Sequence, residues 1–120
     1  MTTYTNLSAS TVDTILSYAV SHSFKEFGGG FGVVGFFGLG ALQGGPMWKF
    51  TFRNGYTASV VKHCGSYGSE QDLWEIAVMR DGELCYDTPI TNDVLGYQSE
   101  SDVMDICKQI AELDNPDSSD

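Results

Sequence analysis

Two hairpin signatures constrain the fold of this chain more than any other feature of its sequence. In residues 48–52, aromatic side chains alternate with polar ones, and Asn54-Gly55 follow. Residues 73–80 alternate in a similar way and are followed by Asp81-Gly82. A period of two is typical of a strand with one buried face, and Asn-Gly or Asp-Gly favours a two-residue type I′ turn. The sequence therefore predicts two antiparallel hairpins, which form a four-stranded meander if their inner strands also pair.

The turn type also predicts which residues face each other across each hairpin. The first return strand is predicted from Tyr56 to about His63, and the expected pairs are Phe52–Thr57, Phe50–Ser59 and Trp48–Val61. In the second hairpin, Glu83–Asp87 form the return strand and Val78 pairs with Cys85. The predicted core face therefore carries Trp48, Phe50 and Phe52 together with Trp74, Ile76 and Cys85.

Helical periodicity flanks the hairpins on both sides. Apolar residues recur at intervals of three and four from Val12 to Phe27, which predicts an amphipathic helix over residues 10–26 with Ser10 as N-cap. A second helix is predicted from its N-cap, Ser99, to about Leu113, with an apolar stripe of Val103, Ile106, Cys107, Ile110 and Leu113. Residues 91–98 are expected to form a loop that turns at Gly96. These elements predict one α+β domain over residues 1–113, with both helices on one sheet face and a disordered acidic tail over residues 114–120.

A glycine-rich segment, residues 28–45, separates the first helix from the hairpins. It holds nine of the 14 glycines and lies in a window without charged side chains. We expect a compact, partly helical segment buried by the sheet or by a second copy of the chain, because glycine permits close backbone approach. Its apolar side chains are the predicted interface of a homo-oligomer: Phe31, Val33, Val34, Phe36, Phe37 and Leu39.

Two other interpretations of this segment have less support. Gly30, Gly32 and Gly35 match the dinucleotide-binding fingerprint, but a helix precedes them and no acidic residue follows at the spacing that a ribose needs. A membrane span needs about 20 predominantly apolar residues, and half of this segment is glycine. Membrane activity therefore stays a secondary alternative, and nucleotide binding is disfavoured.

Charge is distributed unevenly along the chain. The formal net charge is -10, yet residues 1–69 hold two acids and four bases, whereas residues 70–120 hold 14 acids and two bases. This balance disfavours direct nucleic-acid binding, which requires clustered Lys and Arg. The acidic half is either a solvated surface or a patch that docks on a basic partner. The candidate partner-binding acids are Glu70, Asp72, Glu75, Glu100, Asp102, Asp105 and Glu112.

Motifs for catalysis or metal binding are absent from the sequence. It contains no H-E-x-x-H, Walker A, G-x-S-x-G or C-x-x-C pattern. The adjacent His63 and Cys64 point to opposite faces if they lie on a strand, which argues against a catalytic dyad. Three widely spaced cysteines form no zinc set or disulfide framework and suggest reduced thiols in a cytosol. The sequence therefore predicts a protein that is not an enzyme and that has no metal or cofactor.

The segment WEIAVMRDGELCYDTPITNDVLGY (Trp74–Tyr97), followed by an acidic helix, resembles small accessory proteins encoded by bacteriophages. The resemblance covers about residues 47–113 and brings no family catalytic residue with it. Such small acidic phage proteins are similar in kind to inhibitors of host defence, for example anti-CRISPR proteins. The resemblance implies an inhibitor in the host cytoplasm that binds a host protein and blocks a nucleic-acid-facing surface. The alternative from a different class is a homo-oligomeric small-molecule binder whose glycine-rich segment lines an interface pocket.

Overall fold

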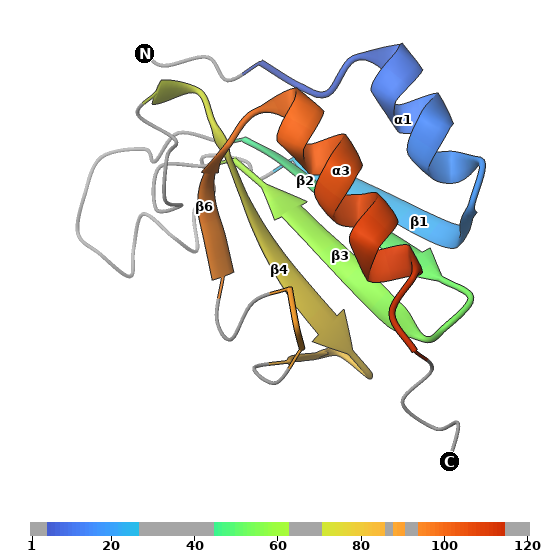
Figure 1. Cartoon of the computed structure of the whole chain (residues 1–120). Helices are drawn as coiled ribbons and strands as arrows, with labels where there is room; N and C mark the ends of the chain where they lie inside the picture. The colour runs from blue at the N-terminus through green and yellow to red at the C-terminus, as the bar shows by residue number, and fades with distance from the viewer. Residues whose placement is uncertain (1–4, 27–44, 63–70, 86–87, 91–93, 115–120) are drawn as a thin grey trace.

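The described part of the chain forms an antiparallel sheet with two helices on one of its faces (Figure 1). The computed structural model describes residues 5–26, 45–62, 71–85, 88–90 and 94–114. In chain order, the elements are α1 (Ala9–Leu16), β1 (Ala19–Glu26), β2 (Pro46–Phe52), β3 (Tyr56–Val61), β4 (Trp74–Arg80), β5 (Glu83–Leu84), β6 (Val94–Gln98) and α3 (Glu100–Ala111). The predicted α+β class, with an N-terminal and a C-terminal helix, is confirmed.

The sheet has six strands in the described part of the chain, where four were predicted. The order is β1-β2-β3-β4-β5, and β6 also pairs with β4. Because β5 pairs with Met79 and Arg80 while β6 pairs with residues 74–77, these two strands share one edge of β4. The predicted meander corresponds to β2 through β5, and the predicted pairing of its inner strands is confirmed by β3 and β4.

The N-terminal helix is much shorter than predicted. Helix α1 ends at Leu16, and residues 19–26 form β1, antiparallel to β2. The prediction of helix to residue 26 is wrong because the apolar residues of this stretch also suit a strand, where Phe24 lies opposite Trp48. Pairing with β2 supplies the backbone hydrogen bonds, and this tertiary contribution outweighs helix propensity. The N-cap is Ser8, which accepts from the backbone N–H of Thr11, and not Ser10.

The first hairpin has a three-residue loop, so the predicted register is wrong by one residue. Gly55 donates its N–H to the carbonyl of Phe52 at 3.0 Å and has a φ of 93°, while Asn54 is not in the left-handed region. A type I turn followed by a left-handed glycine has this geometry, whereas type I′ requires positive φ at both central residues. The observed pairs are Phe50 with Ala58 and Trp48 with Val60. Apolar Ala58 and Val60 thereby join the core face in place of Ser59 and Val61.

The second hairpin agrees with the prediction. Asp81 and Gly82 have φ values of 55° and 82°, as a type I′ turn requires. Arg80 pairs with Glu83, and the N–H of Cys85 donates to the carbonyl of Val78 at 2.8 Å. Cys85 is partly buried against the core, as the predicted register requires.

The predicted loop over residues 91–98 is wrong for residues 94–98, which form β6. The C-terminal helix agrees with the prediction: Ser99 and Asp102 form a reciprocal capping box, and Val103, Ile106, Cys107 and Ile110 are buried. At the other end of α3, the side-chain amide of Asn54 donates to the carbonyls of Ile110 and Leu113, at 2.8 and 2.9 Å. The turn of the first hairpin therefore caps α3.

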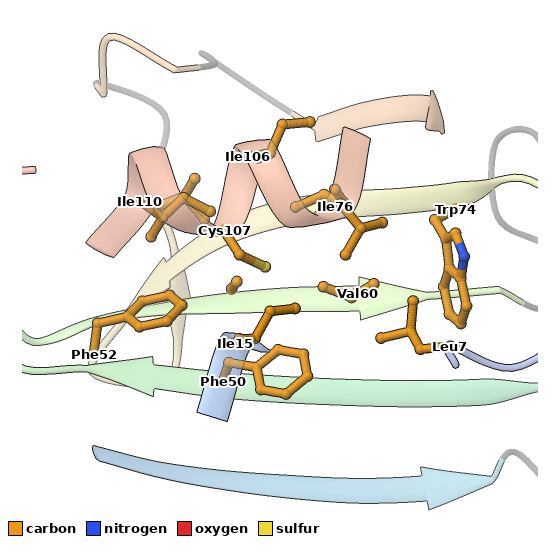
Figure 2. Close-up of a cluster of buried hydrophobic side chains, with 13 residues drawn as sticks. Leu7, Ile15, Phe50, Phe52, Val60, Trp74, Ile76, Ile106, Cys107 and Ile110 are labelled. Carbon is orange, nitrogen blue, oxygen red and sulfur yellow. The ribbon is translucent and has the colours of Figure 1, made fainter. Parts of the chain in front are cut away.

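The hydrophobic core lies between the sheet and the helices (Figure 2). Cys107 projects from α3 towards β2 and β3, Ile15 projects from α1, and Ile106 and Ile110 of α3 belong to the same cluster. Trp74 and Leu7 lie together at one end of this layer, so the N-terminal lead contributes to the core. Burial raises the pKa of the Cys107 thiol to about 12, which keeps it protonated and unreactive at neutral pH.

The glycine-rich segment joins the neighbouring strands β1 and β2, whose ends meet where Glu26 pairs with Pro46. Residues 27–44 lie outside the described residues, and so do the six predicted interface side chains Phe31, Val33, Val34, Phe36, Phe37 and Leu39. The apolar interface therefore stays a prediction.

Candidate functional site

The seven predicted partner-binding acids do not form one surface. Glu70 lies outside the described residues. Glu75 lies on β4 opposite Val61, on the sheet face away from the helices. Asp72, Glu100 and Asp102 accept hydrogen bonds within the fold, so these three carboxylates have structural partners. The remaining two are exposed: Asp105 lies on α3, and Glu112 is its C-cap, where it pairs with Lys108 at 3.9 Å.

Lys62 is the centre of a polar cluster that holds the N-terminal lead against the sheet. Its side chain is 2% exposed. The ammonium donates to the carbonyl oxygen of Thr5 at 2.9 Å and to Oδ1 of Asp72 at 3.0 Å, and it lies 4.3 Å from the ring centroid of Trp74. Oδ1 of Asp72 also accepts from the N–H of Thr5 at 3.0 Å. A buried ammonium is stable only when it is paired in this way, which makes Lys62 a structural residue.

Glu100 connects the starts of the two helices. Its Oε2 accepts from the N–H of Ser8 at 3.0 Å and from the hydroxyls of Ser8 and Thr11. Burial raises the pKa of this carboxyl, but the hydrogen bonds from Ser8 and Thr11 and the charge of Lys62 outweigh it, so the pKa lies below its usual range. The same balance, with Thr5 and Lys62 as partners, lowers the pKa of Asp72. Both acids therefore favour the folded state when ionised.

These lowered pKa values predict acid sensitivity. A carboxyl whose folded pKa lies below its unfolded pKa stabilises the protein above the unfolded value, which is 4.5 for Glu100, and this stabilisation is lost as the pH falls through the folded value. When the pH is lowered from 7 to below 4.5, the free energy of unfolding of Glu100→Gln is therefore expected to fall less than that of the unmodified chain. Urea denaturation followed by far-ultraviolet circular dichroism at both ends of this range measures the difference.

Asp105→Asn is the matched control, because Asp105 is an exposed acid of the same helix. Its loss of stability on acidification is expected to equal that of the unmodified chain. An equal loss in Glu100→Gln would contradict the structural role assigned to the Glu100 carboxylate.

The exposed side of the helical layer is acidic. It carries Asp13 on α1 and Asp102, Asp105 and Glu112 on α3. The one basic residue of the two helices is Lys108, whose ammonium lies 3.9 Å from Glu112 and 4.9 Å from the ring centroid of Tyr18. The helical layer therefore presents net negative charge to solvent.

The opposite face of the sheet has a different chemistry. Hydroxyl side chains from β1, β2 and β3 surround Lys49 there, and the cavity between them has a volume of about 210 Å³. Its lining includes Ser21, Ser23, Lys49, Thr51, Thr57 and Met79. Sequence reasoning missed this polar trough because the stretch that contributes Ser21 and Ser23 was predicted to be helical. The available signal was the alternation of serine with Val20, His22 and Phe24 in positions 20–24.

No group of three His, Cys, Asp or Glu side chains among the described residues is arranged to hold a metal ion. In the same part of the chain, no helix has the length and apolar character needed to cross a bilayer.

Comparison of the chain with protein-family models, with curated proteins and with solved structures finds no match.

Proposed function

We propose that this chain is a non-enzymatic binding protein that uses the acidic outer side of α3 to contact a basic surface of a partner protein. The observation that carries the proposal is the placement of Asp105 and Glu112 on the exposed side of α3, away from the core stripe and the polar cluster. Asp13 extends the same sign of charge to α1, which also contacts α3. Acidic surfaces accelerate and orient association with basic partners.

The class of partner follows from the resemblance of residues 74–97 to phage proteins. A phage inhibitor of this kind acts in the host cytoplasm on a host protein, and a basic groove built for nucleic acid is the natural complement of an acidic helix. Occupying such a groove blocks access of nucleic acid without any catalysis by the inhibitor. The chain itself then needs no basic patch, in keeping with its net charge of -10.

The test compares two double variants that change the net charge equally. Asp105→Asn/Glu112→Gln neutralises the outer side of α3, whereas Asp81→Asn/Glu83→Gln neutralises two exposed acids of the β4–β5 hairpin. Asn is well accepted at position 81, where φ is 55°. Affinity capture from bacterial lysate is expected to retain one basic partner with the chain and the hairpin variant and to lose it with the α3 variant.

Salt dependence completes this test, because interactions between exposed charges weaken as ionic strength rises. Capture of the same partner is expected to fall between low and high salt. Equal capture by both double variants, or capture indifferent to salt, would overturn the electrostatic proposal.

The alternative of a small-molecule binder also has an observation in its favour, namely the polar trough on the open face of the sheet. This location differs from the oligomer interface predicted for residues 28–45. Native mass spectrometry of the purified chain tests both versions: a retained small-molecule mass favours the binder, and the subunit count tests the predicted homo-oligomer.

A further inference from the structure

We infer that the polar trough on the open sheet face is a binding site for a phosphate monoester, with Lys49 as its anchoring cation. The trough lies on the sheet face opposite α1 and α3, so this site is separate from the acidic surface of the proposed function. Three features of the trough indicate a phosphate site: the hydroxyl side chains around Lys49, a lining without acidic residues, and the volume of the cavity.

The register of the strands places hydroxyls on both sides of Lys49. Ser23 of β1 and Ser59 of β3 are its direct neighbours across β2. In the next row, Thr51 of β2 lies between Ser21 and Thr57. Residues directly opposite each other in antiparallel strands project to the same face. This sheet face therefore carries two rows of hydroxyls from three strands around one ammonium, and all of these hydroxyl residues except Ser59 line the trough.

Lys49 is half-buried, and no acceptor among the described residues lies within hydrogen-bonding or ion-pairing distance of its ammonium. Lys62, which directly follows β3, shows the contrast, since its ammonium has two oxygen partners. An ammonium without an acceptor has unused donors, which an incoming anion can satisfy. None of the residues that line the cavity is acidic, although the chain as a whole is.

The hydroxyls also have hydrogen atoms to donate. The hydroxyl oxygens of Thr51 and Thr57 lie 3.0 Å apart, so one hydroxyl donates to the other and the second is left to donate outwards. Donors then approach the cavity from β1, β2 and β3. A tetrahedral oxyanion accepts from several directions, whereas a planar carboxylate is best matched by a flat pair of donors such as an arginine. The geometry therefore favours phosphate over carboxylate.

The size of the cavity limits the rest of the ligand. Its volume of about 210 Å³ is below the range of about 300–1,000 Å³ typical of pockets for drug-sized ligands. A phosphate with a short carbon chain fits this volume, and the side chain of Met79 offers it an apolar contact at one side of the lining. A nucleotide is too large for it. With Lys49 as the one lysine and no arginine in the lining, which also includes His22, we expect dissociation constants in the millimolar range.

Nuclear magnetic resonance titration of the full chain tests the site. The probes are inorganic phosphate and glycerol phosphate, with acetate as the planar anion, all at constant ionic strength. We expect saturable shifts of the backbone amide signals of Ser23, Lys49, Thr51 and Thr57 with either phosphate probe. Tighter binding of glycerol phosphate identifies a monoester as the ligand, and equal binding assigns the site to free phosphate. Equal binding of acetate would overturn the phosphate class.

Matched variants separate a site from general charge attraction. Lys49→Met is expected to weaken binding by about tenfold or more, the effect of removing a charged hydrogen-bonding partner. Lys25→Met removes the same charge from an exposed neighbour on the same sheet face and is expected to leave binding unchanged. Thr51→Val, which preserves shape, is expected to weaken binding while the thermal midpoint stays close to that of the unmodified chain. Equal losses in Lys49→Met and Lys25→Met, or the absence of saturable shifts, would overturn the proposal.

Discussion

Replacing Phe50 with alanine is expected to lower the free energy of unfolding by about 3–5 kcal/mol, the usual cost of truncating a buried aromatic side chain. Phe50 is 0% exposed and lies on β2, between β1 and β3. Its ring stacks on Trp48 with centroids 5.5 Å apart and an interplanar angle of 6°. Truncation removes apolar burial and leaves a cavity that neighbouring strands, fixed by their backbone hydrogen bonds, are unable to fill. Urea denaturation followed by far-ultraviolet circular dichroism measures the loss.

Phe24→Ala is the matched control, because Phe24 lies on the adjacent strand and projects to the same face. Its side chain is 42% exposed, and its ring centroid lies 4.5 Å from that of Trp48. We expect a loss of about 1 kcal/mol, since less area returns to water and no closed cavity forms. Equal losses in the two variants would contradict the assignment of the core to the helix-covered part of the sheet.

Replacing Lys62 with alanine is expected to lower the free energy of unfolding by about 2–3 kcal/mol, because the variant loses charged hydrogen bonds and side-chain packing together. The carbonyl of Thr5 loses its donor, and the ring of Trp74 loses the cation that covers it. Asp72 is 46% exposed, so water replaces part of its lost interaction and limits the effect. Besides denaturation, amide hydrogen exchange is expected to rise in the N-terminal lead, where the N–H of Thr5 depends on Asp72.

Two further variants identify which part of Lys62 matters. Lys62→Met retains the apolar stem beside Trp74, and its loss is therefore expected to be smaller than that of Lys62→Ala. Lys49→Ala removes a half-buried lysine from the same sheet without breaking a hydrogen bond, and a change within about 0.5 kcal/mol is expected. If Lys49→Ala were as destabilising as Lys62→Ala, the special role of the polar cluster around Lys62 would be refuted.

Local sequence signals determined the features whose partners are close in the chain. The type I′ turn at Asp81-Gly82 follows from residues that accept positive φ, and the capping box of Ser99 and Asp102 follows from their spacing. The stripe of α3 from Val103 to Ile110 follows from its helical period. In each case, the interactions that favour the observed conformation join residues only a few positions apart, so the sequence alone predicts the structure.

Two of the wrong predictions, the helix to residue 26 and the register of the first hairpin, arose where local signals were ambiguous. Apolar residues at 20 and 24 suit a helix by spacing and a strand by alternation, and only the edge of β2 decides between them. Asn54-Gly55 favours a two-residue turn, but the side chain of Asn54 caps the distant α3 while a three-residue loop places Ala58 and Val60 in the core. The competing conformations differ little in local energy, so the larger tertiary contribution sets the register.

The candidate sites, like the fold, depend partly on local sequence signals and partly on contacts that form only in the tertiary structure. Sequence alone determined that this chain is acidic, with hairpins and a C-terminal amphipathic helix, because composition and periodicity are local properties. Only the tertiary structure separated Asp72 and Glu100, which accept hydrogen bonds within the fold, from Asp105 and Glu112 on the outer side of α3. It alone brought serines of β1 beside Lys49. The physical reason is that hydrogen bonds and charge pairs join residues far apart in the chain, and their partners are known only once the strands are paired.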